Sequence, residues 1–142
     1  MLGDVTAGLV LLAITVIVHA AGMTALLKWL MRPGALVEER FWGTTWLVVR
    51  TAWYLIAIHL VEITVWAMFY WEQRCLPDLQ SAVYFSGVTY TTVGYGDLVL
   101  PKQWQLLGPL EALTGILMCG LSTGFFFALV SKLFAGKTKP AR

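Results

Sequence analysis

The sequence predicts an all-α membrane protein with three transmembrane helices and one short re-entrant helix. Of its 142 residues, 58% are apolar and 13% are charged, whereas charged residues make up about 25% of an ordinary soluble domain. This composition, with a mean hydropathy of +0.73, excludes the soluble globular, disordered and nucleic-acid-binding classes. Three spans use most of the chain, which leaves no room for a large ligand-binding domain.

Three long apolar stretches account for the predicted spans. Residues 5–27 contain no Asp, Glu, Lys or Arg, and as a helix they would extend about 34 Å, enough for the ~30 Å hydrocarbon core. Residues 42–71 are interrupted by Arg50 and Glu62, and residues 104–132 by Glu111. Each stretch is therefore long and apolar enough to cross a bilayer.

The first stretch has an alternative interpretation as a secretory signal peptide, since Val18-His19-Ala20 offers small residues for cleavage. Signal peptides carry positive charge before an apolar region of about 7 to 15 residues. This chain has Asp4 and no Lys or Arg before the first stretch, and the stretch is longer. A transmembrane helix is the better interpretation.

Basic residues predict the orientation, because Lys and Arg are retained on the cytoplasmic side. In a three-span arrangement Arg74 and Lys102 fall on one side. The remaining basic residues fall on the other side: Lys28, Arg32, Arg40, Arg50, Lys132, Lys137, Lys139 and Arg142. We therefore expect the N-terminus outside, the C-terminus inside, and the segment between the second and third spans outside.

A short apolar run, Ser81 to Tyr90, lies between the second and third spans. It is too short to cross a bilayer, and such runs are typical of re-entrant or interfacial helices. The run leads into Thr91-Thr92-Val93-Gly94-Tyr95-Gly96-Asp97. Glycine adopts left-handed backbone angles without a Cβ penalty. We expect such angles at Gly94 and Gly96.

The run, the TTVGYGD motif and the two flanking spans resemble the pore domain of the potassium channel superfamily. The resemblance implies a pore domain over residues 43–135. It also implies an extra N-terminal transmembrane helix with a cytoplasmic link (1–42) and a short basic tail (136–142). The expected activity is passive, potassium-selective conduction, with K⁺ as the permeating ion, no cofactor and no enzymatic reaction. A minimal pore of this kind suggests a prokaryotic inner membrane.

The resemblance also implies roles for individual residues. The potassium ligands would be the Thr92 hydroxyl and the backbone carbonyls of Thr92, Val93, Gly94 and Tyr95. The Tyr95 ring would pack behind the filter, and Asp97 at the outer mouth would hydrogen-bond to a neighbour such as Tyr84. Support for the filter would come from Gly96, Asp97, Tyr84 and Phe85.

One chain supplies one filter segment, defined here as residues 91–97, and it contains no internal repeat of that segment. A closed ring therefore needs several copies around an axis, and the family implies a homotetramer surrounded by lipid. A subunit of a potassium uptake transporter is an alternative, but one full motif in one short chain argues against it. A non-conducting regulatory membrane subunit is another alternative.

Gly115 and Gly120 in the third stretch are the candidate gating hinges. Glycine in a helix permits either a bend or close helix packing, and the sequence does not choose between the two. Arg50 is the single basic residue inside the first two stretches, so a voltage-sensing helix, which carries regularly spaced Arg, is not predicted.

His19, His59 and Glu62 form a predicted intramembrane polar cluster. His59 and Glu62 lie three residues apart on one face of the second span, and His19 lies near the middle of the first. Ionisable groups in a membrane are costly and usually face protein or water. We expect the cluster to dock the first helix on the second. Proton sensing is the alternative, because histidine titrates near physiological pH.

Glu111 and Cys75 each keep two interpretations. Glu111 either pairs behind the short helix or faces the outer vestibule. Cys75 is expected outside the bilayer and Cys119 within it, so the two cannot readily form a disulfide inside one chain. Cys75 is then either a free thiol or half of an intersubunit disulfide.

Overall fold

The computed structural model describes residues 2–32 and 41–135, and every element within them is helical. In chain order these are α1 (Leu2–Leu30), α2 (Phe41–Glu72), α3 (Leu79–Tyr90), the short 3₁₀ helix η1 (Lys102–Trp104) and α4 (Leu107–Ala135). Three helices are long and apolar enough to cross a membrane, which confirms the predicted fold class. The link at 33–40 and the tail at 136–142 lie outside the described residues.

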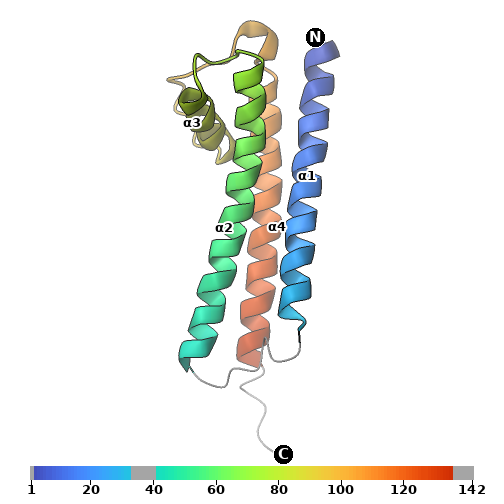
Figure 1. Ribbon diagram of the computed structural model, residues 1–142, viewed down its shortest axis with the longest axis vertical. Helices are drawn as coiled ribbons and strands as arrows, with labels where there is room; N and C mark the ends of the chain where they lie inside the picture. The colour runs from blue at the N-terminus through green and yellow to red at the C-terminus, as the bar shows by residue number, and fades with distance from the viewer. Residues whose placement is uncertain (1, 33–40, 136–142) are drawn as a thin grey trace, which may run out of the picture.

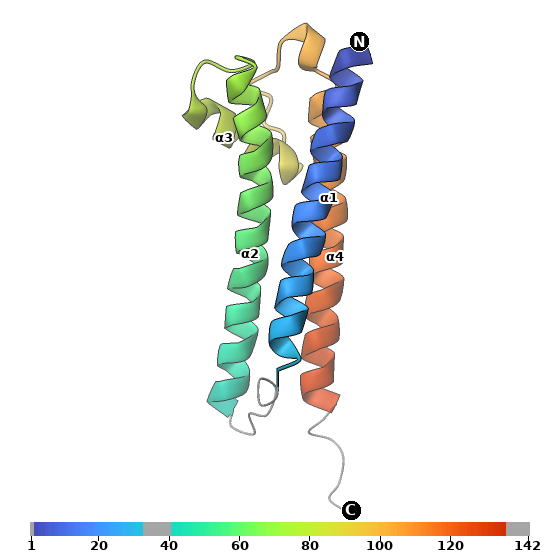
Figure 2. The ribbon, with the colours of Figure 1, turned by 45° about the vertical axis from the view of Figure 1, so that its right-hand side comes forward.

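The three long helices run side by side, and α3 lies beside one end of α2, away from α1 (Figure 1). Turned by 45°, the molecule shows α1 in front of α4 while α3 stays near α2 (Figure 2). The helix α3 begins two residues earlier than the apolar run predicts. Asp78 caps its start, because the Asp78 carboxylate accepts a hydrogen bond from the Ser81 backbone N–H at 2.7 Å.

α1 packs against both α2 and α4 through one narrow face. Leu11, Thr15, His19, Leu26 and Leu30 are buried along that face, and their spacing of four or seven residues is that of a single helical stripe. Two glycines bring the helices close. Gly8 lies against Leu107 and Leu110, and Gly22 lies against Ile58. The rest of α1 carries exposed apolar side chains suited to lipid, including Leu9, Val10 and Ile17.

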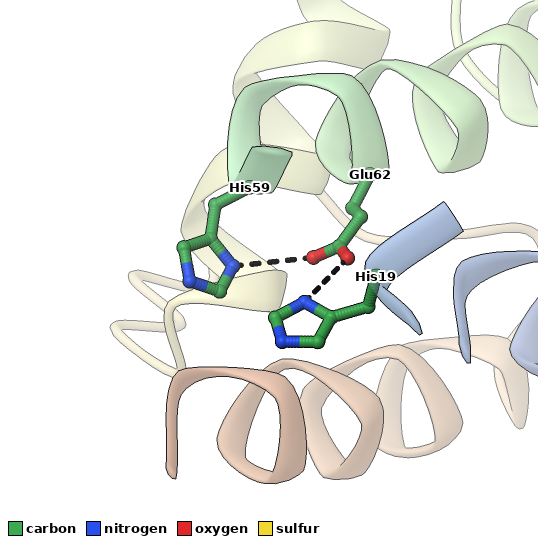
Figure 3. Close-up of side chains that lie close together, drawn as sticks. All are labelled: His19, His59 and Glu62. Carbon is green, nitrogen blue, oxygen red and sulfur yellow. Dashed lines mark hydrogen bonds and ion pairs between the residues drawn. The ribbon is translucent and has the colours of Figure 1, made fainter. Parts of the chain in front are cut away.

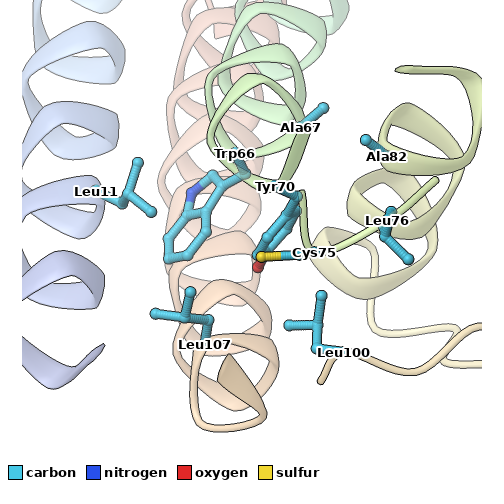
Figure 4. Close-up of a cluster of buried hydrophobic side chains, with 9 residues drawn as sticks. All are labelled: Leu11, Trp66, Ala67, Tyr70, Cys75, Leu76, Ala82, Leu100 and Leu107. Carbon is cyan, nitrogen blue, oxygen red and sulfur yellow. The ribbon is translucent and has the colours of Figure 1, made fainter. Parts of the chain in front are cut away.

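A hydrophobic cluster holds α3 and the following chain against the long helices (Figure 4). It comprises Leu11, Trp66, Ala67, Tyr70, Cys75, Leu76, Ala82, Leu100 and Leu107. The Cys75 thiol is free and buried in this cluster, and burial raises its pKa. The structure therefore shows Cys75 as a buried free thiol within a single chain.

Gly115 is the point of closest approach between α4 and the end of α3. A Cβ atom at Gly115 would collide with the backbone carbonyl oxygen of Tyr90, whereas a Cβ at Gly120 would meet nothing within 4 Å in the same chain. The helix α4 is continuous through both positions. Gly115 therefore packs closely against the end of α3, and the gating hinges at Gly115 and Gly120 stay predictions.

We predict that Gly115→Ala destabilises the protein, because the added methyl group must displace the backbone of α3. Overpacking of this kind costs about 1–3 kcal/mol. The matched control is Gly120→Ala, which adds the same methyl group to the same helix in open space. Unfolding in detergent, followed by circular dichroism during titration with SDS, measures both. Equal midpoints for the two variants would contradict the close approach.

Candidate functional site

α3 ends so that the chain turns directly into the filter segment. The Val88 carbonyl accepts hydrogen bonds from the N–H groups of Val93 and Gly94, at 2.9 and 3.2 Å, and the Thr89 carbonyl accepts from Thr92 N–H at 2.9 Å. These bonds satisfy carbonyls of the last helical turn that the helix itself leaves unpaired. They also fix the start of the filter segment to the carboxyl end of α3.

Left-handed backbone angles alternate along the filter segment. The angle φ is +63° at Thr92, +55° at Gly94 and +77° at Gly96. The prediction for the two glycines is confirmed, and the angle at Thr92 was not foreseen, because a β-branched residue rarely adopts this conformation. An alternation with a period of two residues turns successive carbonyls toward the same side, which is the arrangement that an ion pathway lined by carbonyls requires.

The filter segment is poorly covered by its own chain. The side chains of Val93 and Tyr95 are 52% and 72% exposed, and a Cβ at Gly94 or Gly96 would meet nothing within 4 Å. Tyr95 was expected to pack behind the filter, yet α3 of the same chain does not bury its ring. A single chain therefore sets where this segment begins and leaves its outer part uncovered.

Tyr84 and Phe85 leave α3 in different directions. The Tyr84 hydroxyl donates a hydrogen bond to the Asp97 carboxylate at 2.8 Å, which raises the pKa of Tyr84 and ties the outer end of the filter segment to α3. Phe85 instead packs edge-on against Tyr70 of α2, with ring centroids 5.3 Å apart. Phe85 thus anchors α3 to α2, so its support of the filter segment is indirect.

Glu111 lies behind α3, fully buried, which decides between its two sequence interpretations. The Tyr70 hydroxyl donates to one carboxylate oxygen at 2.7 Å, and the Ser86 hydroxyl lies 2.5 Å from the other. The Ser86 oxygen is also 2.8 Å from the Ile63 carbonyl. Glu111 of α4 therefore joins α2 and α3 through hydrogen bonds in the membrane interior.

A second buried carboxylate, Glu62, lies in a hydrogen-bond network that includes side chains from all three long helices and from α3. Its two oxygens lie 2.9 Å from His19 Nδ1 and 3.1 Å from His59 Nδ1 (Figure 3). The Tyr90 hydroxyl donates to the same carboxylate. His59 Nδ1 is also 3.0 Å from the Tyr90 hydroxyl, and its Nε2 is 3.1 Å from Ser122 Oγ. We call these five residues the Glu62 network.

The Glu62 network contains a possible set of metal ligands. One ligand atom each from His19, His59 and Glu62 lie within 4.8 Å of one another. However, the Nδ1 atoms of His19 and His59 already hydrogen-bond to the Glu62 carboxylate. The geometry is therefore that of a hydrogen-bond network rather than of a metal site. His19 Nε2 is the exception, because it is buried and has no hydrogen-bond partner among the described residues.

Sequence reasoning brought His19, His59 and Glu62 together but missed Tyr90 and Ser122. Tyr90 ends an apolar run, where an aromatic ring is ordinarily interpreted as core. The available signal was its hydroxyl, since a buried tyrosine usually finds a hydrogen-bond partner. Ser122 gave no such signal, because a serine in a transmembrane helix commonly bonds within its own helix.

We predict that Tyr70→Phe destabilises the protein by about 1–3 kcal/mol, because buried Glu111 loses a donor that nothing replaces. The matched control is Tyr54→Phe, which removes an exposed hydroxyl whose bond to the Gly22 carbonyl is 3.3 Å long. The unfolding midpoint in SDS titration measures both changes. A loss at Tyr54 as large as that at Tyr70 would contradict the assigned role of Glu111.

A comparison with known protein families identifies the family of this chain. Residues 41–132 match the family model described as ion channel. This region contains α2, α3, the filter segment and most of α4, whereas α1 precedes it. No curated protein and no solved structure matched the chain. Because the match covers well over half of the sequence, the protein belongs to the ion channel family.

Proposed function

We propose that the chain forms a passive, potassium-selective channel. The observation that carries this proposal is the alternation of left-handed angles at Thr92, Gly94 and Gly96 within the TTVGYGD sequence. A potassium ion that leaves water must exchange its hydration shell for oxygens of similar energy, and a row of backbone carbonyls supplies them. The ligands in this proposal are the carbonyls of Thr92, Val93, Gly94 and Tyr95, with the Thr92 hydroxyl at the inner end.

α3 adds an electrostatic contribution to the same pathway. The carboxyl end of a helix carries a partial negative charge, and the carboxyl end of α3 adjoins the filter segment. Asp97 at the other end of the segment holds a carboxylate near the exposed mouth. Both features favour cations over anions, and the carbonyl spacing then selects among cations. The transported K⁺ is cargo, and the proposal needs no cofactor.

The surface that one chain leaves uncovered supports assembly as a homotetramer. The filter segment is exposed, and so is a run of large apolar side chains on α4 near it: Leu113, Ile116, Leu117 and Leu121. A closed ring of identical chains would cover this surface and surround an axis. In the proposed tetramer α4 lines the cavity, and α2 lies outside it.

The proposed orientation places α3 and the filter segment on the outer side of an inner membrane. The end of α1, the start of α2 and the end of α4 meet at the opposite end of the bundle (Figure 1). Lys28, Arg32 and Lys132 lie near that end, which is the cytoplasmic end by the positive-inside rule. Other basic residues used for this prediction lie outside the described residues.

We predict potassium flux from liposomes that contain only the purified chain. The flux should be blocked by barium and should exceed sodium flux under the same gradient. Gly94→Ala should abolish the selectivity, because an L side chain at φ +55° is strained. The matched control is Gly108→Ala, where a Cβ also meets nothing within 4 Å and φ is not positive. Equal sodium and potassium flux from the unchanged protein would contradict potassium selectivity.

A mass measurement tests the assembly. Native mass spectrometry, or light scattering corrected for detergent, should give four times the chain mass of 15.8 kDa. A monomer or dimer would contradict the tetramer. A stable tetramer that passes no ions under any tested condition would instead favour the non-conducting regulatory subunit.

A further inference from the structure

The Glu62 network links α1 to the inner end of the filter segment. His19 comes from α1, His59 and Glu62 from α2, Tyr90 from α3, and Ser122 from α4. Tyr90 is the last residue of α3, two positions before the innermost proposed potassium ligand, Thr92. The path from α1 to the filter segment therefore runs His19, Glu62, Tyr90.

Glu62 couples the positions of His19, His59 and Tyr90, because all three side chains bind the same carboxylate. The side chain is 0% exposed, and three donors converge on its two oxygens: His19 Nδ1, His59 Nδ1 and the Tyr90 hydroxyl. A buried carboxylate that loses a donor has no water to replace it in a membrane interior. The remaining donors must then shift toward the carboxylate, and Tyr90 is among them.

Tyr90 is held from two sides, which makes its position sensitive to such a shift. Its ring hydroxyl is bound by Glu62 and lies 3.0 Å from His59 Nδ1. Its backbone carbonyl lies so close to Gly115 that a Cβ there would collide with it. Thr91 and Thr92 follow with hydrogen bonds back to α3, so a rotation of Tyr90 carries the Thr92 carbonyl with it.

α1 does not need His19 in order to dock. The close contacts at Gly8 and Gly22 already pack α1 on α4 and α2, and Trp66 Nε1–H donates to Thr15 Oγ1 at 3.0 Å. His19 is 2% exposed and leaves its Nε2 atom without a partner among the described residues. An apolar side chain at this position would dock the helix without that cost.

We propose that His19 is a positioning residue for ion selectivity. By donating to Glu62 it fixes the carboxylate, the carboxylate fixes the Tyr90 ring, and Tyr90 fixes the inner potassium ligand at Thr92. The helix α1 precedes the matched ion channel region, and in this proposal it contributes to ion selectivity through His19. This inference rests on the proposed potassium-channel function.

The test compares variants of the full chain in liposomes by their potassium-to-sodium permeability ratio, obtained from reversal potentials. His19→Leu should lower the ratio about tenfold, as expected for one lost hydrogen bond to a buried charge. His19→Asn should restore it, because the Asn side-chain amide places an N–H near the position of Nδ1. Tyr90→Phe should lower the ratio as His19→Leu does, and the double variant should add little further.

The matched control is Thr15→Val, which removes another buried bond between α1 and α2 on the same helical face. This bond does not reach α3, so the variant should keep the ratio of the unchanged protein. Equal losses in Thr15→Val and His19→Leu would overturn the proposal in favour of docking. An unchanged ratio in assembled His19→Leu would overturn it as well.

Two further outcomes separate this proposal from the proposed function. If the unchanged protein shows no potassium selectivity, the proposed function itself fails, and the positioning role fails with it. If His19→Leu does not assemble, Tyr90→Phe decides, since it leaves α1 and the bond between His19 and Glu62 in place. An unaltered ratio in Tyr90→Phe would overturn the proposal.

Discussion

A carboxylate buried in a membrane interior dictates much of this architecture. Glu62 is fully buried on α2, at a depth where unpaired polar groups are expensive. The chain meets this constraint by bringing one donor from α1, one from α3 and one from a neighbouring turn of α2. Each donor fixes the rotation of its own helix. Glu62 therefore ties α1, α2 and α3 together at one depth, in addition to the close contacts that pack α1 at Gly8 and Gly22.

Glu111 is a second buried carboxylate that binds donors from other helices, and it contacts α3 one turn before Tyr90. The buried face of α3 consists of Ala82, Ser86 and Tyr90, which are spaced four residues apart. Ser86 meets Glu111, and Tyr90 meets Glu62. A helix of three turns is marginal in isolation, and lipid supplies no hydrophobic force to press it against its neighbours. A carboxylate facing each of two turns of α3 therefore adds hydrogen bonds to the apolar cluster that packs this helix.

The fold was predictable from the sequence because membrane spans depend on length and hydropathy, both of which are local properties. The left-handed glycines at 94 and 96 were predictable for a similar reason, since one residue type suits that backbone. Other features depend on distant partners. The contact of Tyr90 with Glu62 joins residues 28 positions apart, and that of His59 with Ser122 joins residues 63 apart. Such pairs are set by helix packing, which no local pattern encodes.

Glu111 is another residue whose environment depends on distant partners. Sequence reasoning identified it as an ionisable residue in a span but could not choose the side it faces. The choice depends on the Tyr70 hydroxyl and the Ser86 hydroxyl converging from two other helices. The positive φ at Thr92 is likewise imposed, because hydrogen bonds back to α3 hold a β-branched residue in an unfavourable conformation.

The two ends of the filter segment are therefore controlled differently. The inner end is fixed within one chain, by Gly115 against the Tyr90 backbone and by Glu62 against the Tyr90 ring. Beyond Thr92, the exposed side chains of Val93 and Tyr95 have little packing from their own chain, and Tyr84 restrains the outer end through Asp97. One chain thus determines where the carbonyl row starts. In the proposed tetramer, contacts with neighbouring copies would define the rest of its path. A displacement of Tyr90 would then shift the start of the row and every carbonyl that follows it.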